Sequence, residues 1–376
     1  MYLVGLLIAI IVFLLVVALH EAGHMLVAKA FGVGVIEYSI GMGPILFSKR
    51  KKDTVYSLRA IPFGGYCAMY GEESMEASGK GDDVSNKKYR RKPDFKTDWR
   101  EDQMLVSKSW WQRLLIYIAG PFSNIILGIV ACLMLVVAFG GASVPEVVEL
   151  MDDHPAKAVG IQVGDIICGV NDRDTLTWMD YTEYLDTHVS ECKDGYVVRV
   201  WRDDEVLSFD AIQNPDDGYF GITVRQQPVD LTLANIALFT WDDTRYMFRL
   251  VADGFHMLFA GDAHMSDMSS IIGVSDIIAT DVTEASEEEG SSVISIAFFM
   301  MALLSINVGL INLLPFPALD GGRTVMCIFE GVFRRKIPTR LEYAVNYVGM
   351  VLLLLLLTYT AFNDVVRIIT RLASSG

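Results

Sequence analysis

The sequence predicts a polytopic α-helical membrane protein with four transmembrane helices, a membrane-associated β-hairpin or small sheet on the cytoplasmic side, and one extracytoplasmic α+β domain. Hydrophobic residues make up 52% of the 376 residues, and the mean hydropathy of +0.37 is high for a soluble protein. Four apolar runs are long enough to cross a hydrocarbon core of ~30 Å. These runs are Leu3–Ala30, Leu114–Phe139, Val293–Leu314 and Ala344–Phe362.

Charged residues between the runs predict the topology. Basic clusters follow the first and third runs, and by the positive-inside tendency these segments are cytoplasmic. The clusters are Lys49–Lys52, Lys87-Lys88, Arg90–Lys92, Arg334–Lys336 and Arg340. The N-terminus and the acidic central region are then outside. The net charge of −15 comes mainly from that central region and argues against nucleic-acid binding.

The first run ends in His20-Glu21-Ala22-Gly23-His24. On one helix, His20 and His24 are four residues apart and share a face, and Glu21 lies beside that face. Helical H-E-x-x-H is typical of a zinc site in which the Glu activates a water molecule. An ionisable cluster in an apolar helix is costly, which also favours a functional site. A signal peptide is the alternative, but the run is too long and lacks a basic start and a small-x-small cleavage site.

Residues 54–71 predict strands around a turn at Pro62-Phe63-Gly64-Gly65. Such a pair is either an ordinary cytoplasmic hairpin or one that dips into the membrane where protein covers it. If a substrate adds a strand there, Tyr66 and Ala68 are the expected edge donors. Residues 72–108 are polar and predict a connection with little regular structure.

The second run begins at Trp110-Trp111, aromatic residues suited to a membrane interface. Gly120-Pro121 predicts a kink, and Asn124 is a polar group at membrane depth. Asn124 fits either a packing role beside the kink or a contact with substrate.

The region from Val144 to Gln227 has the composition of a small soluble domain. Its segment Pro155–Asn171 predicts a short helix, a Gly turn and a strand that ends in an Asn-Asp turn. This segment resembles a PDZ domain of the permuted bacterial-protease form, which implies binding of peptide ends by strand addition. The expected groove lies near Val144–Val148 and the helix at Tyr181–His188. An amphipathic helix over 231–262 and an acidic tether over 281–292 follow.

A third zinc ligand is expected at the end of the third run, in Asn312–Arg323. Two prolines and two glycines release the backbone there, and Asp320 is the anionic residue of the motif. Because this run starts outside, Asp320 lies near its cytoplasmic end. That is also the depth expected for His20 and His24.

Together the H-E-x-x-H motif, the Asn312–Gly322 motif, Gly120–Asn124, the Pro-Phe-Gly-Gly-Tyr turn and one PDZ-like domain resemble the site-2 protease family of intramembrane zinc metalloproteases. The closest resemblance is to the bacterial regulator-of-sigma-E-protease branch. It implies one Zn²⁺, the ligands His20, His24 and Asp320, and Glu21 as the general base. It also implies substrate contacts at Asn312, Asn124, Gly64 and Gly65, and we add Tyr66 and Pro315 to this substrate-binding set. Two departures are the single PDZ-like domain and the unusual element Ser269–Gly273.

The expected division of the chain follows from these features. The first helix with its motif occupies 1–31, the hairpin and linker 32–108, the second helix 109–140, the PDZ domain 141–228, the amphipathic helix and tether 229–292, the third helix 293–323, a cytoplasmic loop 324–343, and the fourth helix with its tail 344–376. Five cysteines fit no disulfide framework, and whether Cys168 and Cys192 pair is left open.

We therefore expect a multi-pass protein of the bacterial cell membrane that cleaves single-span membrane proteins, such as anti-sigma factors or signal-peptide remnants, within their transmembrane segments. A non-catalytic metal-binding PDZ scaffold or chaperone is the alternative, and a metal transporter is a third interpretation. Glu21 beside two histidines favours catalysis, because a scaffold needs no general base. The substrate, the cleavage position, the oligomeric state and the mode of PDZ binding stay open.

Overall fold

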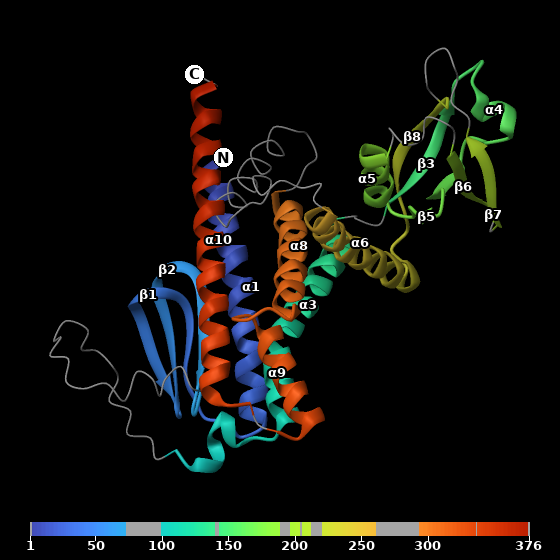
Figure 1. The fold of residues 1–376 in the computed structure, drawn as a ribbon. Helices are drawn as coiled ribbons and strands as arrows, with labels where there is room; N and C mark the ends of the chain where they lie inside the picture. Colours follow the sequence, from blue (N-terminus) through green and yellow to red (C-terminus); the bar gives the residue numbers. More distant parts are fainter. Residues whose placement is uncertain are drawn as a thin grey trace. The chain divides into compact units, whose positions relative to one another are not determined.

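The computed structural model describes residues 2–72, 99–139, 143–188, 196–203, 205–211, 220–260, 293–335 and 337–374 (Figure 1). The chain forms two compact units, one of residues 1–128 with 251–376 and one of residues 129–250. Among the residues that the structure describes, four helices are long and apolar enough to cross a membrane, and they coincide with the four predicted runs. These segments are Leu3–Ala30, Trp110–Ala138, Val293–Leu313 and Ala344–Asn363.

The first unit is built on helices that approach closely at small residues. Its helices are α1 (Tyr2–Ala30), α3 (Trp110–Phe139), α8 (Val293–Leu313), α9 (Asp320–Phe333) and α10 (Thr339–Ser374), with short 3-10 turns at Glu101–Gln103 and Leu105–Ser107. Gly23 of α1 lies directly against the carbonyl of Ala119 on α3, and Gly128 of α3 lies against Ile306 of α8. A side chain at either glycine would separate the helices. The three helices that contribute to the site are therefore held at backbone distance.

A two-stranded antiparallel sheet of β1 (Val35–Lys51) and β2 (Thr54–Met69) packs beside α1 (Figure 1). Both strands bend, because Gly41, Gly43 and Gly64 have positive φ angles of 82°, 82° and 78°. The bends let residues 37–40 pair with residues 65–68 on one side and residues 55–58 on the other. Among the described strands, residues 65–69 therefore form an outer edge.

The chain reverses at the predicted Pro62–Gly65 position, but it does so inside β2: residues 55–58 run in the same direction as residues 37–40, and residues 65–68 run in the opposite direction. β2 runs through these residues, and a further reversal joins β1 to β2 between Lys51 and Thr54, where Lys52 has a φ of 54°. The Gly pair produces a bend inside the strand rather than its end. From sequence alone, two adjacent glycines in a strand pattern fit either a turn between two strands or a bend within one strand.

The third span ends in a break and not in a loop. α8 stops at Leu313, and α9 begins at Asp320 after six irregular residues. The segment 324–343, predicted as a cytoplasmic loop, is helical in its first half, because α9 continues to Phe333. Arg113 of α3 pairs with Glu330 of α9, and Glu330 also accepts a hydrogen bond of 3.0 Å from the Ile337 backbone N–H. These contacts fix α9 to the rest of the first unit.

The second unit contains a six-stranded sheet with the order β7-β6-β4-β3-β8, in which β5 pairs with β4. A core of Val147, Ile167, Tyr181, Val198 and Phe220 fills the space between the sheet and its helices. The strands are β3 (Ser143–Leu150), β4 (Ile166–Val170), β5 (Arg173–Asp174), β6 (Tyr196–Arg202), β7 (Glu205–Ala211) and β8 (Ile222–Pro228), and the helices are α4 (Pro155–Val159), α5 (Trp178–His188) and α6 (Leu233–Ala260).

The groove predicted at Val144–Val148 is wrong. β3 is paired along its whole length with β8 and also pairs with β4 at Glu146. A strand with partners on both sides has no free edge for a peptide. The edge strand on this side is β8.

Several predictions lie outside the described residues. These are the basic clusters at Lys87–Lys92, most of the linker over 72–108, the Ser269–Gly273 element, the acidic tether, and Cys192 with its open pairing to Cys168. The domain division and the membrane orientation stay predictions.

Candidate metal centre

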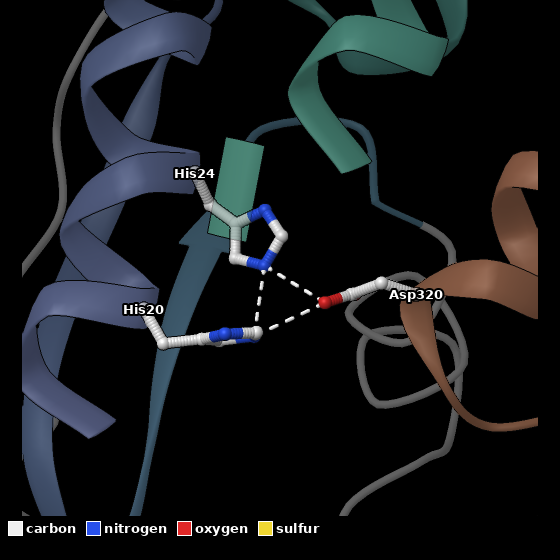
Figure 2. A group of neighbouring side chains, drawn as sticks. All are labelled: His20, His24 and Asp320. Atoms are coloured by element: carbon white, nitrogen blue, oxygen red, sulfur yellow. Dashed lines mark hydrogen bonds and ion pairs between the residues drawn. The ribbon is translucent and has the colours of Figure 1, made fainter. Parts of the chain in front are cut away.

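Two imidazoles and one carboxylate converge in the first unit (Figure 2). His20 and His24 lie one turn apart on α1, and their Nε2 atoms are 3.3 Å from each other. Asp320 Oδ2 lies 3.1 Å from each of these nitrogens. Both histidines are buried, with 8% and 6% of their surfaces exposed. The spacing of four residues on a helix explains why the two rings face one point.

The break between α8 and α9 brings Asp320 to that point. Ala318 has a φ of 75°, and its backbone N–H donates to Asn346 Oδ1 of α10 at 3.2 Å. Gly349, one turn further along α10, lies against Pro317, where a Cβ would come within 2.5 Å of the ring. Asp320 is the first residue of α9, so its carboxylate also lies at the positive end of a helix. Contacts from α10 thus hold the strained turn that orients the third ligand.

Residues behind the two rings hold them in place. His24 Nδ1 is 2.7 Å from the carbonyl oxygen of Ile116, and Asn124 Nδ2 is 3.2 Å from His20 Nδ1. Gly120 lies directly against the His24 ring, and any Cβ there would overlap Nε2. All three residues are on α3, so the kinked helix predicted from Gly120-Pro121 serves as the wall behind the site.

The donor set fits zinc. Two imidazole nitrogens and one carboxylate oxygen lie within 4.8 Å of one another, which matches the His₂-carboxylate sets of catalytic zinc sites. A backbone carbonyl on His24 Nδ1 fixes the tautomer that leaves Nε2 free to bind a metal.

Glu21 lies on the side of α1 that faces the sheet. A Cβ on Gly65 would come within 3.3 Å of Glu21 Cγ and 3.0 Å of Val17 Cγ1. The strand β2 therefore passes the acid at backbone distance, and only a glycine at position 65 permits this. Glu21 thus packs against the edge strand from the same helix that carries His20 and His24.

The other predicted site residues are spread around this centre. Asn312 is in the last turn of α8 and half-buried, and Pro315 is exposed in the break. Gly64 forms the bend of β2, and the Tyr66 hydroxyl contacts Arg59 Nη2 at 2.5 Å. Asn124 is fully buried behind His20, not on a surface open to a peptide.

Sequence reasoning missed several supporting residues. Asn346 and Gly349 carried no signal, because one Asn and one Gly in an apolar helix have many explanations. The ion pair between Arg323 Nη1 and Glu72 Oε1, 2.6 Å long, was also missed. It ties the end of β2 to α9 one turn after Asp320.

Comparisons with known proteins agree with this geometry. The profile of peptidase family M50 matches residues 8–356. The zinc metalloprotease RasP of Shouchella clausii is 26% identical over 420 residues, covering 96% of this chain and 98% of the relative. The regulator of sigma-W protease RasP of Bacillus subtilis is 26% identical over 422 residues, covering 96% and 97%. The metalloprotease MmpA of Caulobacter vibrioides is 28% identical over 377 residues, covering 94% and 93%.

Proposed function

The chain belongs to peptidase family M50, and from this premise we propose that His20, His24 and Asp320 hold the zinc ion of an intramembrane metalloprotease. The reaction is hydrolysis of a peptide bond in the transmembrane segment of a membrane protein. The convergence of three ligand atoms is the observation that carries this proposal: two are on a helix long enough to span a membrane, and the third follows the end of another such helix. Relatives named zinc metalloprotease over nearly the whole chain support the choice of metal.

His20, His24 and Asp320 would hold the zinc ion, which would supply Lewis-acid activation of water and of the scissile carbonyl when bound. Glu21 is the general base. It takes a proton from the attacking water and returns it to the leaving amine. His20 and His24 bind through Nε2, and Asp320 contributes the negative charge of the ligand set, because the two imidazoles are neutral when they bind a metal. Asn312 lies just before the break between α8 and α9, and we propose that its half-buried amide contacts the substrate backbone.

A helical substrate must be unwound before it is cut, because its backbone groups are bonded within the helix. We propose that residues 65–69 of β2 accept the unwound segment as an added strand. Gly65 supports this, since it brings the edge past Glu21. Gly64 and Tyr66 shape the same edge, Gly64 through its bend and Tyr66 through its contact with Arg59. Pro315 is exposed in the break that ends at Asp320, and we keep it in the proposed substrate-binding set.

The outward donors of this edge differ from those expected. The Tyr70 N–H donates to Gly34 O at 2.7 Å. Because N–H groups alternate along a strand, those of Ala68 and Tyr66 also point toward β1. The Cys67 N–H then points away from β1, as does that of Met69, which is 3.3 Å from Glu72 Oε2. Cys67, and not Tyr66 or Ala68, is the free donor that a substrate strand would meet.

The second unit is proposed to be an extracytoplasmic PDZ domain that binds peptide ends or excludes substrates with large outer domains. The free edge of β8 is the place for an added strand, and Phe220-Gly221 precedes it with a φ of 90° at the glycine. The proposed substrates are single-span proteins of a bacterial cell membrane. The sigma-W regulator among the relatives suggests anti-sigma factors as one class.

The test is cleavage of a co-expressed library of single-span proteins, read by mass spectrometry. Glu21→Gln is expected to keep its zinc and to lose turnover by ~10²- to 10⁴-fold, the usual contribution of a general base. His24→Ala is expected to lose zinc as well. Normal cleavage by Glu21→Gln would leave only the scaffold interpretation.

A further inference from the structure

The two histidines differ in what lies behind them. His24 Nδ1 faces the Ile116 carbonyl oxygen at 2.7 Å, and a carbonyl can only accept a hydrogen bond. His20 Nδ1 faces the side-chain amide of Asn124 at 3.2 Å, and an amide offers both a donor and an acceptor. The tautomer of His24 is therefore fixed by the backbone, whereas that of His20 depends on one side chain.

Asn124 has a buried acceptor that is not satisfied. Its side chain is fully buried, and its Oδ1 has no hydrogen-bond partner among the residues that the structure describes. Such an atom in a native interior needs an explanation. An imidazole that binds a metal through Nε2 carries its proton on Nδ1 and requires an acceptor there. A half-turn of the amide exchanges Oδ1 and Nδ2 and places Oδ1 where it can accept the Nδ1–H of His20.

The surroundings of Asn124 permit this rotation but not a shift of the residue. Ser305 Oγ on α8 donates to the Asn124 backbone carbonyl at 2.7 Å. Gly309, one turn along α8, faces the Asn124 side chain, where a Cβ would lie 3.5 Å from Asn124 Cβ. The backbone is held by α8 while the amide stays beside the His20 ring.

We propose that Asn124 is a positioning residue for zinc binding: its Oδ1 accepts the Nδ1–H of His20 and so keeps the Nε2 lone pair directed at the metal. This assigns Asn124 to the metal and not to the substrate. The inference rests on the proposed zinc site, and it makes His20 the ligand whose geometry a single substitution can control.

The decisive comparison is between Asn124→Leu and Asn124→Asp, with zinc affinity measured by chelator competition in detergent. Leu keeps the shape but removes the acceptor, and we expect affinity to fall by ~10- to 100-fold, as for other outer-shell partners. Asp keeps an acceptor, and we expect it to rescue most of the loss. If Asn124 only fills space, Asn124→Asp is expected to lose more zinc affinity than Asn124→Leu, because a buried carboxylate disturbs packing more than Leu does.

A spectroscopic readout separates this role from a general loss of structure. In nitrogen-15 spectra of the zinc-loaded, histidine-labelled protein, Asn124→Asp is expected to shift the Nδ1–H signal of one zinc-bound imidazole. The signal of the second, which is bonded to the Ile116 carbonyl, is expected to stay. If both signals stay unchanged, the proposal is overturned.

Two controls complete the design. Ser305→Ala removes a hydrogen bond to the same residue but leaves the amide in place, so it is expected to bind zinc with unchanged affinity. A loss equal to that of Asn124→Leu would reduce Asn124 to a packing role. His24→Ala separates the two proposals: if it loses zinc while Asn124→Leu does not, only this inference fails, and if it keeps zinc, the metal centre itself is wrong.

Discussion

Gly120 of α3 lies so close to His24 that a single methyl group at position 120 would overlap the Nε2 atom of the ring. The neighbouring atoms belong to an imidazole that is already bonded to the Ile116 carbonyl on its other side. The ring therefore cannot move away without losing that bond. The glycine sets the position of a proposed metal ligand on a different helix.

Gly120→Ala is therefore expected to weaken zinc binding by at least about tenfold, the scale of other changes that disturb ligand orientation. Zinc content after dialysis against a weak chelator measures this. Gly254→Ala is the matched control, because a Cβ at this helical glycine meets nothing within 4 Å. Equal zinc content in the two variants would contradict the packing described here.

Cys67→Pro is expected to impair cleavage while zinc content stays normal. Proline removes the outward N–H and is tolerated at a sheet edge. Cys67→Ala loses the same thiol but keeps the N–H, so it is expected to cleave normally. Tyr66→Pro removes an inward donor and is expected to destabilise the sheet, as seen by faster proteolysis of β1 and β2. Cleavage by Cys67→Pro at the rate of Cys67→Ala would exclude strand addition at this edge.

The packing of α5 on α6 is expected to weaken as pH rises. Burial, together with the neighbouring carboxylates of Asp242 and Asp180, raises the pKa of Asp243 to about 7. The folded unit therefore holds this proton more tightly than the unfolded chain does. The resulting stability is complete below the ordinary carboxyl pKa of 3.8 and is lost as pH rises toward 7.

Hydrogen exchange at residues 240–250 measures this effect between pH 5 and pH 8, after correction for the intrinsic exchange rate. Arg245 and Arg249 face the same carboxylates, since Arg245 pairs with Asp242 at 2.6 Å and Arg249 pairs with Asp180 at 2.7 Å. Asp243→Asn lacks the titrating group and is expected to show no such trend. A trend that persists in this variant would assign the effect to another group.

The membrane orientation is tested by single-cysteine labelling of intact cells after the native cysteines are replaced. A cysteine at the exposed position Arg50 is expected to be protected from an impermeant maleimide, and one at the exposed position Asp203 to react. Reaction at position 50 from outside would invert the predicted topology.

The sequence allowed prediction of features that local patterns determine. His20 and His24 needed only helical spacing, and the four spans needed only run length. The structure of the Pro-Phe-Gly-Gly segment could not be predicted from local patterns alone. The same glycines permit a turn or a bend, and only the pairing of residues 37–40 on both sides decided between them.

Long-range contacts account for the other differences. The edge position of β8 in the second sheet follows from its pairing with β3, which lies about 75 residues earlier in the chain. Local sequence patterns do not indicate a pairing over this separation. Asn124 fitted either a packing role beside the kink or a contact with substrate, and its burial behind His20 argues against the contact with substrate. Such roles depend on which helix faces which, and no local pattern encodes this.

The distance along the chain between His24 and Asp320, 296 residues, has a consequence for biosynthesis. At a translation rate of ~5–20 residues per second, the histidine pair is made roughly 15–60 s before the aspartate. During that interval the growing chain sits at the insertion machinery among other nascent membrane segments with an incomplete ligand set. The enzyme is thus latent while it is being made, and it becomes able to cut its neighbours only after nearly all of it has been synthesised.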